Sequence, residues 1–202
     1  RARFYEYPRF TYPWHFHSEY EIIYVEKGEG DCLVGDSIIS YSKGDLILFG
    51  SELPHSMQSP PDGGEESDNE EKTEPKVRGV NIQFEKDFMH YSISQYSQFI
   101  PIRNLLEDAC RGIKFTITRS GKIIKLLEQI PSAKGADQII LLLSLLQMMA
   151  TSNHKKYLTT SHYTPSPSIM RNERMEKVIA YLNKHYTESI GLDEIASYTA
   201  MN

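Results

Sequence analysis

The side chains best suited to chemistry lie in HFHSEYE, residues 15–21. Because alternate residues of a β-strand project from one face, His15, His17 and Glu21 are predicted to converge on one point. His55, which follows a proline farther along the chain, adds a third imidazole. Three imidazoles and a carboxylate suit a divalent transition metal such as Zn, Ni, Fe or Mn, with positions left for water or substrate. The same groups can also hydrogen-bond an organic ligand without any ion, and the spacing leaves both alternatives open.

Short β-type runs must position these groups. Up to about residue 90, the runs EIIYVEKGEG, DCLVGD, IISYSKGD, LILFG and VRGVNIQF are separated by Gly, Asp and Pro at close intervals. This spacing is typical of an antiparallel barrel or sandwich. In the last run Asn81 and Gln83 share a parity, which makes Gln83 a candidate ligand contact facing the interior.

An acidic segment dominates the charge of the chain. The formal net charge is −5, and PPDGGEESDNEEKTEP (60–75) alone contributes −6, which leaves +1 for the rest. The charge therefore neither favours nor excludes a nucleic-acid partner. Because this segment is rich in Pro, Gly and charge but almost without apolar residues, the loop over 58–76 is predicted to be disordered.

The pattern changes to helix near residue 91, and residues 91–158 are predicted to form a helical region. Its segment ADQIILLLSLLQMMATS (136–152) is apolar nearly all round. It must therefore pack against the barrel or against a second copy of the chain, and both remain open. The polar stretch TTSHYTPSPS predicts a semi-extended linker over 159–168. A new amphipathic helix follows in RNERMEKVIAYLNKHY.

The first half of the chain resembles the cupin family. His15-x-His17, three residues, Glu21, six residues and Gly28 are similar to the first cupin motif. Gly44-Asp45 with the later Pro54-His55 resembles the second, without its usual Pro-x-Gly. The resemblance implies a mostly β cupin (a double-stranded β-helix or jelly-roll barrel) over residues 1–90, followed by α-helices, and thus an α+β chain overall. Carried over residue by residue, it implies His15, His17, Glu21 and His55 as metal ligands.

The end of the chain resembles the AraC/XylS family of transcription regulators. YLNKHYTESIGLDEIASYTAMN is similar to the start of that family's helix-turn-helix domain, so residues 169–202 are interpreted as an incomplete DNA-binding domain. In that pattern Asn202 would cap the recognition helix, an N-cap residue suited to the position. HFHSEYEIIYVEKGEG, GDLILFGSELPHSM, NIQF and CRGIKF resemble the family's cupin-sensor subgroup in the same order.

The two resemblances together imply a sensor and not an enzyme. They predict a small-molecule effector, with a sugar favoured, bound in the barrel at His15, His17, Glu21, His55 and Gln83. Residues 91–158 would make a homodimer, and DNA would bind through the helices that follow. The alternative is a metal-dependent cupin enzyme of dioxygenase or isomerase type.

The remaining features concern location. Cys32 and Cys110 form no CxxC motif, and no secretory leader is visible, which is typical of a reducing cytoplasm. The longest apolar stretch, residues 139–150, is too short to cross a bilayer. We therefore expect a cytoplasmic protein with no membrane partner.

Overall fold

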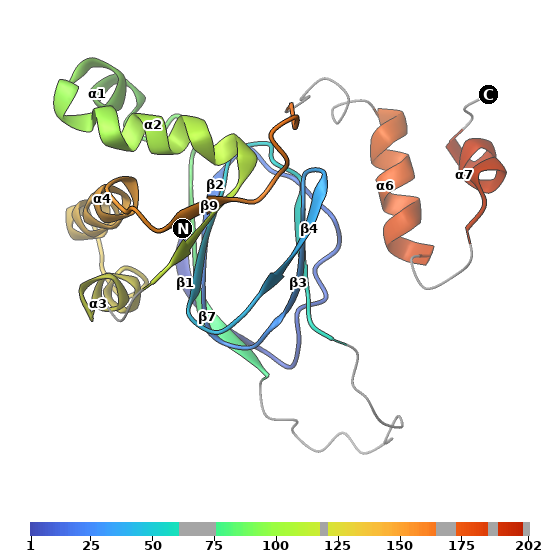
Figure 1. Cartoon of the computed structure of the whole chain (residues 1–202), viewed down its shortest axis with the longest axis horizontal. Coiled ribbons are helices and arrows are strands. Elements are labelled where there is room, and N and C mark those ends of the chain that lie inside the picture. Colours follow the sequence, from blue (N-terminus) through green and yellow to red (C-terminus); the bar gives the residue numbers. More distant parts are fainter. Residues whose placement is uncertain (61–75, 118–120, 165–172, 186–189, 200–202) are drawn as a thin grey trace.

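The computed structural model covers residues 1–202 and describes all of them except 61–75, 118–120, 165–172, 186–189 and 200–202 (Figure 1). Most of the loop predicted to be disordered over 58–76 lies outside the described residues. The predicted capping residue Asn202 lies outside them as well.

The described strands form two antiparallel sheets. The larger sheet has six strands in the order β1-β7-β2-β5-β8-β9, and the smaller has three in the order β4-β3-β6. The strand bounds are β1 Ala2–Tyr7, β2 Tyr20–Lys27, β3 Gly30–Val34, β4 Ser37–Tyr41, β5 Asp45–Phe49, β6 His55–Gln58, β7 Val77–Phe84, β8 Ile113–Thr116 and β9 Lys155–Tyr157. The two sheets face each other across the interior (Figure 1). The predicted cupin-like, mostly β architecture followed by helices is confirmed.

The inner faces of the two sheets enclose one hydrophobic core. It combines alternate residues of β2, such as Ile23 and Val25, with Cys32 and Val34 of β3 and Met57 of β6, all at most 7% exposed. Glu21 shares the inward parity of Ile23, because strand residues two apart lie on one face. The core therefore continues directly into the region that holds the polar side chains.

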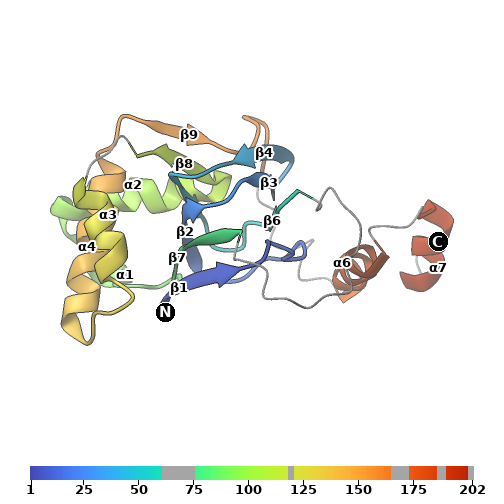
Figure 2. The ribbon, with the colours of Figure 1, turned by 90° about the horizontal axis from the view of Figure 1, so that it is seen from below.

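The outer face of the larger sheet carries a second core under the helices. Ile22 of β2 and Leu48 of β5 pack there against Leu127 of α3 and Leu145 of α4. The described helices have the bounds α1 His90–Gln95, α2 Ile100–Asp108, α3 Gly121–Gln129, α4 Ala136–Ala150, α6 Glu173–His185 and α7 Leu192–Thr199. Helices α1 to α4 lie on one side of the sheets, whereas α6 and α7 lie on the other (Figures 1 and 2). Because β2 is buried on both faces, its apolar residues are nearly continuous.

The region predicted to be helical contains two strands. Residues Ile113–Thr116 and Lys155–Tyr157 are β8 and β9, which extend the larger sheet beyond β5. Both strands are short, at four and three residues. Periodicity therefore gave no signal for them. The barrel extends beyond residue 90, and its last strand ends at Tyr157.

Helix α4 divides its apolar surface between the core and the solvent. Leu142, Leu145 and Leu146 are at most 6% exposed and pack in the core, as one of the two open interpretations predicted. Ile139 and Ile140 are 44% and 58% exposed on the described chain. An apolar face thus remains outside the core on this helix.

The start of the predicted linker is attached to the barrel. Thr159 is buried, and the backbone N–H of Thr160 donates to Asp36 Oδ1 at 3.0 Å, while the Thr160 hydroxyl donates to Asp36 Oδ2. A Cβ on Gly35 would lie 2.6 Å from Thr159 Cγ2 and 2.8 Å from the Tyr163 ring, so the glycine allows this close approach. The start of the segment predicted to be a semi-extended linker is therefore held against the barrel. Residues 165–168 lie outside the described part.

Candidate functional site

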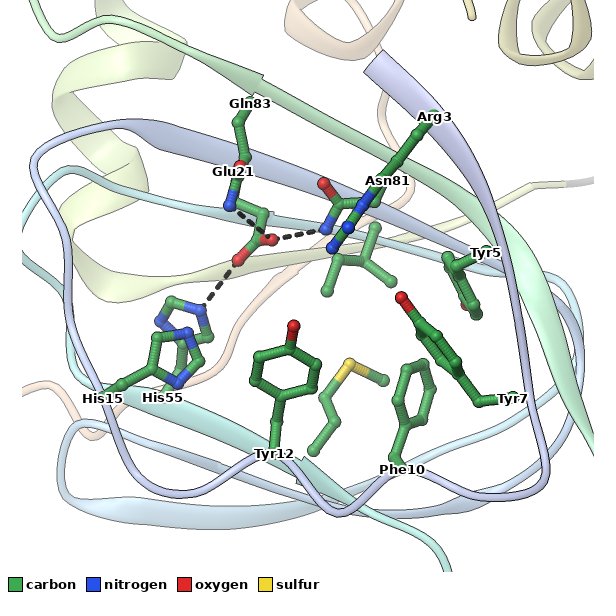
Figure 3. A pocket seen from close by; sticks show the side chains of 12 residues that line it. Arg3, Tyr5, Tyr7, Phe10, Tyr12, His15, Glu21, His55, Asn81 and Gln83 are labelled. Carbon is green, nitrogen blue, oxygen red and sulfur yellow. Dashed lines mark hydrogen bonds and ion pairs between the residues drawn. The ribbon is translucent and has the colours of Figure 1, made fainter. Parts of the chain in front are cut away.

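A cavity of about 70 Å³ opens between the two sheets, beside β1 and the segment that follows it (Figure 3). Its wall is half aromatic and apolar side chains and half charged, imidazole or amide side chains. Convergent polar groups beside aromatic rings are typical of a small-molecule site. The lining residues are Arg3, Tyr5, Tyr7, Phe10, Tyr12, His15, Glu21, Ile23, His55, Met57, Asn81 and Gln83.

Backbone pairing brings the predicted histidines together. His15 and His55 form an isolated antiparallel bridge, in which the N–H of each donates to the carbonyl of the other at 3.1 and 2.9 Å. Their ring centroids lie 4.5 Å apart, and the His17 ring lies 5.3 Å from that of His55. His55 is 2% exposed and its ring stacks on Phe49 at 4.2 Å, so packing fixes its orientation.

Each imidazole is oriented by a backbone carbonyl. The Nδ1 atoms of His15, His17 and His55 lie 2.8, 3.1 and 2.8 Å from carbonyl oxygens of residues 13, 19 and 53. Since a carbonyl only accepts hydrogen bonds, Nδ1 carries the proton in all three rings. The Nε2 atoms of His17 and His55 then face the carboxylate of Glu21.

Glu21 is the centre of the polar cluster. Its Oε2 lies 2.8 Å from His55 Nε2 and 3.3 Å from His17 Nε2. Its Oε1 accepts hydrogen bonds from the amides of Asn81 and of Gln83, the latter at 3.1 Å. Glu21 is 5% exposed, so nearly all of its polar contacts are made inside the protein.

These contacts shift the protonation of the cluster. Burial raises the pKa of the Glu21 carboxyl, but hydrogen bonds with His17, His55 and Asn81 outweigh it and hold the pKa well below its usual range. The hydrogen bond with Glu21 raises the pKa of His17 against the opposing effect of burial. Burial lowers the pKa of His15, and the neighbouring His55 lowers it further.

Part of the chain matches a known family. Residues 1–67 match the family model described as the AraC-like ligand binding domain. The match spans β1 to β6 and therefore includes His15, His17, Glu21 and His55.

Solved structures resemble the chain at low identity. ToxT from Vibrio cholerae O395 is 13% identical, with a TM-score of 0.49, and the match covers 100% of this chain and 72% of that one. Unsaturated fatty acid bound ToxT from Vibrio cholerae strain SCE256 is 16% identical, with a TM-score of 0.48, and the match covers 100% of this chain and 69% of that one. A Bacillus subtilis oxalate decarboxylase mutant is 14% identical, with a TM-score of 0.29, and the match covers 82% of this chain and 33% of that one. No curated protein sequence matches the chain. Since these TM-scores are below 0.5, the assignment depends on the family model.

The four predicted metal ligands fit a metal ion in type and nearly in position. One ligand atom from each of His15, His17, Glu21 and His55 lies within 4.8 Å of the others. Atoms bound to one ion at about 2.1 Å are at most about 4.2 Å apart, so small side-chain movements would suffice. Oxygen Oε2 of Glu21 also faces two Nε2 atoms that lack a proton in the neutral rings. A proton or a cation must therefore lie between them.

The sequence interpretation missed several residues of the cavity. The structure brings Gln83 beside Glu21, as strand parity predicts, but Arg3, Tyr5 and Tyr7 also line the cavity from β1. Their spacing of two residues in ARFYEY is the signal that would have found them, because β1 pairs with β7 and places Arg3 opposite Asn81.

No helix in the described part of the chain is long and apolar enough to span a membrane.

Proposed function

We propose that the chain is the ligand-sensing and dimerisation region of a DNA-binding transcription regulator of the AraC type. A small effector binds in the cavity between the two sheets. The observation that carries the proposal is this cavity, which lies inside a domain of a ligand-binding family and is lined by aromatic rings and amides. No nucleophile with an adjacent base is among the residues that line the cavity, which favours binding over turnover.

A sugar or a related metabolite is the effector class to test first. The rings of Tyr7, Phe10 and Tyr12 line one part of the cavity, and aromatic faces stack on the apolar face of a sugar ring. Gln83 and the Nε2 atom of His15 lie along the same cavity and can hydrogen-bond hydroxyl groups. Binding there would take place in the cytoplasm, where such a regulator acts.

The effector would act by changing how two copies of the chain are arranged. The exposed face of α4, with Ile139 and Ile140, supports a dimer interface on the helical side of the sheets. Helices α6 and α7 are interpreted as the start of the helix-turn-helix domain, whose recognition helix would follow Asn202. To regulate, the effector must bind one arrangement of the dimer more tightly than the other.

A thermal-melt panel tests this function. Sugars and related metabolites are added to the protein with and without a chelator. The concentration of each is raised until it reaches about a hundred times the dissociation constant of a compound that binds. A ligand at that concentration stabilises the fold by about 2.7 kcal/mol, which raises the Tm by roughly 5 to 10 °C at this chain length. A shift that survives the chelator, with no turnover of the compound, supports the proposal. Saturable turnover of any bound compound overturns it.

The ligand geometry of the histidine cluster favours a second candidate, a metal-dependent cupin enzyme. Backbone carbonyls orient all three imidazoles so that Nε2 is the metal-binding atom, an arrangement common in metal sites. A bound ion would supply Lewis-acid chemistry to a substrate oxygen. Asn81 and Gln83 would hold Glu21 in place for it. Elemental analysis of the purified protein tests this candidate: about one transition metal per chain, lost on His55→Ala with loss of turnover, would favour it.

A further inference from the structure

We propose that the effector carries a carboxylate, which pairs with Arg3. This inference depends on the proposed function and names the chemical class that the cavity recognises. Arg3 projects from β1 at the position opposite Asn81, and Figure 3 shows its guanidinium at the cavity beside Asn81. It is the one cationic side chain, other than the histidines, among the residues that line the cavity.

The guanidinium has no anionic partner in the described part of the chain. No Asp or Glu oxygen there lies within 4.0 Å of Arg3, and no hydrogen bond of its side chain is found there. The nearest carboxylate along the cavity is that of Glu21, whose two oxygens already contact His17, His55, Asn81 and Gln83. A half-buried guanidinium needs a charged partner or water, and a ligand carboxylate matches its fork of donors.

Two tyrosine hydroxyls add donors on the same side. Tyr5 uses its hydroxyl to donate to the carbonyl of Tyr24 at 3.0 Å. The hydroxyls of Tyr7 and Tyr12 have no partner in the described part of the chain and point into the cavity (Figure 3). With Arg3 they form a set of donors without a matching acceptor, and a carboxylate supplies two acceptor oxygens.

The size of the cavity restricts the class further. Its volume is about 70 Å³. On this measure a cavity needs roughly 10 to 15 Å³ to hold one water molecule, so the space is that of several water molecules. Tyr12 is 48% exposed, so its ring can turn outward and admit a ligand of sugar size. The geometry therefore favours compact hydroxy acids and sugar acids over long-chain acids.

Matched pairs of ligands test the charge directly. Lactate is compared with propylene glycol, and galacturonate with galactose, because each acid differs from its partner by a carboxylate in place of a hydroxymethyl group. The panel is extended by further small acids, each with its alcohol. Binding is measured by calorimetry on the full chain at low and high KCl. We expect at least one acid to bind with its alcohol at least tenfold weaker, and we expect salt to weaken the acid alone.

Variants then locate the contact. Arg3→Gln should weaken binding of the acid by about 10- to 100-fold, the effect of losing a charged hydrogen-bond pair, while Arg3→Lys should retain part of it. Arg9→Gln makes the same charge change at an exposed residue and should bind as the unaltered chain does. The carboxylate inference is wrong if an alcohol binds as tightly as its acid. It is also wrong if Arg3→Gln leaves the affinity for an acid and the Tm unchanged. In either case the effector function stands. If neither member of any pair binds, both fail.

Discussion

Replacing Glu21 by Gln and by Ala separates hydrogen bonding from charge in the histidine cluster. A glutamine has nearly the same shape but one acceptor oxygen and one NH2 group. Its oxygen can accept from Asn81 and Gln83 as Oε1 does now. Its NH2 group then faces the Nε2 atoms of His17 and His55. Since Nδ1 of both rings already donates to a backbone carbonyl, their neutral Nε2 atoms are acceptors for the two amide hydrogens.

The magnitudes follow from this count of partners. In Glu21→Gln all four contacts can be kept, so the free energy of unfolding should change by less than about 1 kcal/mol. In Glu21→Ala the amide of Asn81 and the ring of His55 lose their partner while buried, at about 1 to 3 kcal/mol each, and a space is left. We therefore expect Glu21→Ala to lose at least about 3 kcal/mol, or roughly 6 to 12 °C in Tm.

The measurement is thermal unfolding by circular dichroism at neutral pH in the presence of a chelator, so that no ion contributes. Glu29→Gln and Glu29→Ala serve as controls, because Glu29 is exposed. Both changes at this surface position should stay within about 0.5 kcal/mol. Equal losses for Glu21→Gln and Glu21→Ala would refute the assignment of the ring protons. The carboxylate charge itself, and not the hydrogen-bond pattern, would then be what the cluster requires.

Four other substitutions test the fold, the proposed dimer and the attachment of Thr160. Ile140→Lys should leave a folded monomer, measured by light scattering, and a dimeric variant would contradict the α4 interface. Leu142→Lys should instead unfold the chain, because Leu142 is 6% exposed and a buried unpaired charge is costly. In Gly79→Ala the added Cβ would lie 1.9 Å from a backbone oxygen. Overpacking costs about 1 to 3 kcal/mol, so the Tm should fall by roughly 2 to 12 °C. An unchanged Tm would mean that β7 can shift. Asp36→Asn should speed proteolysis after Thr160, because the amide weakens the two hydrogen bonds that hold this residue; equal cleavage rates would show that other contacts suffice.

The site was largely predictable because its main residues form a local pattern. His15, His17 and Glu21 lie within one short segment, although His15 and His17 precede β2, which begins at Tyr20. Strand parity placed Gln83 beside Glu21. His55 was a candidate from its residue type and the preceding proline, but its place beside His15 depends on a bridge between distant residues that periodicity does not predict. The mostly β fold was predicted from the Gly, Asp and Pro residues that separate the short apolar runs. The position of Gln83 was predictable because it depends on backbone periodicity, whereas the convergence of the histidines depends on the long-range bridge between His15 and His55.

The remaining features depend on packing that the sequence pattern does not encode. Arg3 lies in the cavity because β1 pairs with β7, a contact across nearly eighty residues. The strand Lys155–Tyr157 exists because it extends the edge of the sheet next to β8, and its composition is otherwise polar. The hydrophobic pattern of α4 likewise gave no way to distinguish buried Leu142 from exposed Ile140. In each case the partner, and not the local sequence, decides the structure.

His55 of the histidine cluster and Thr160 at the start of the predicted linker are both attached to the turn that follows β3. His55 is paired with Val34 at the end of β3, and the N–H of the next residue, Gly35, donates to the carbonyl of Pro54 at 2.9 Å. Asp36, one residue farther on, holds Thr160. A ligand that moves His55 must therefore strain or shift this turn, because His55 is bound to it by backbone pairing and Thr160 by the side-chain carboxylate of Asp36. Coupling by this route requires that the turn has two arrangements, and hydrogen exchange at Gly35 with and without a bound ligand would detect the second one.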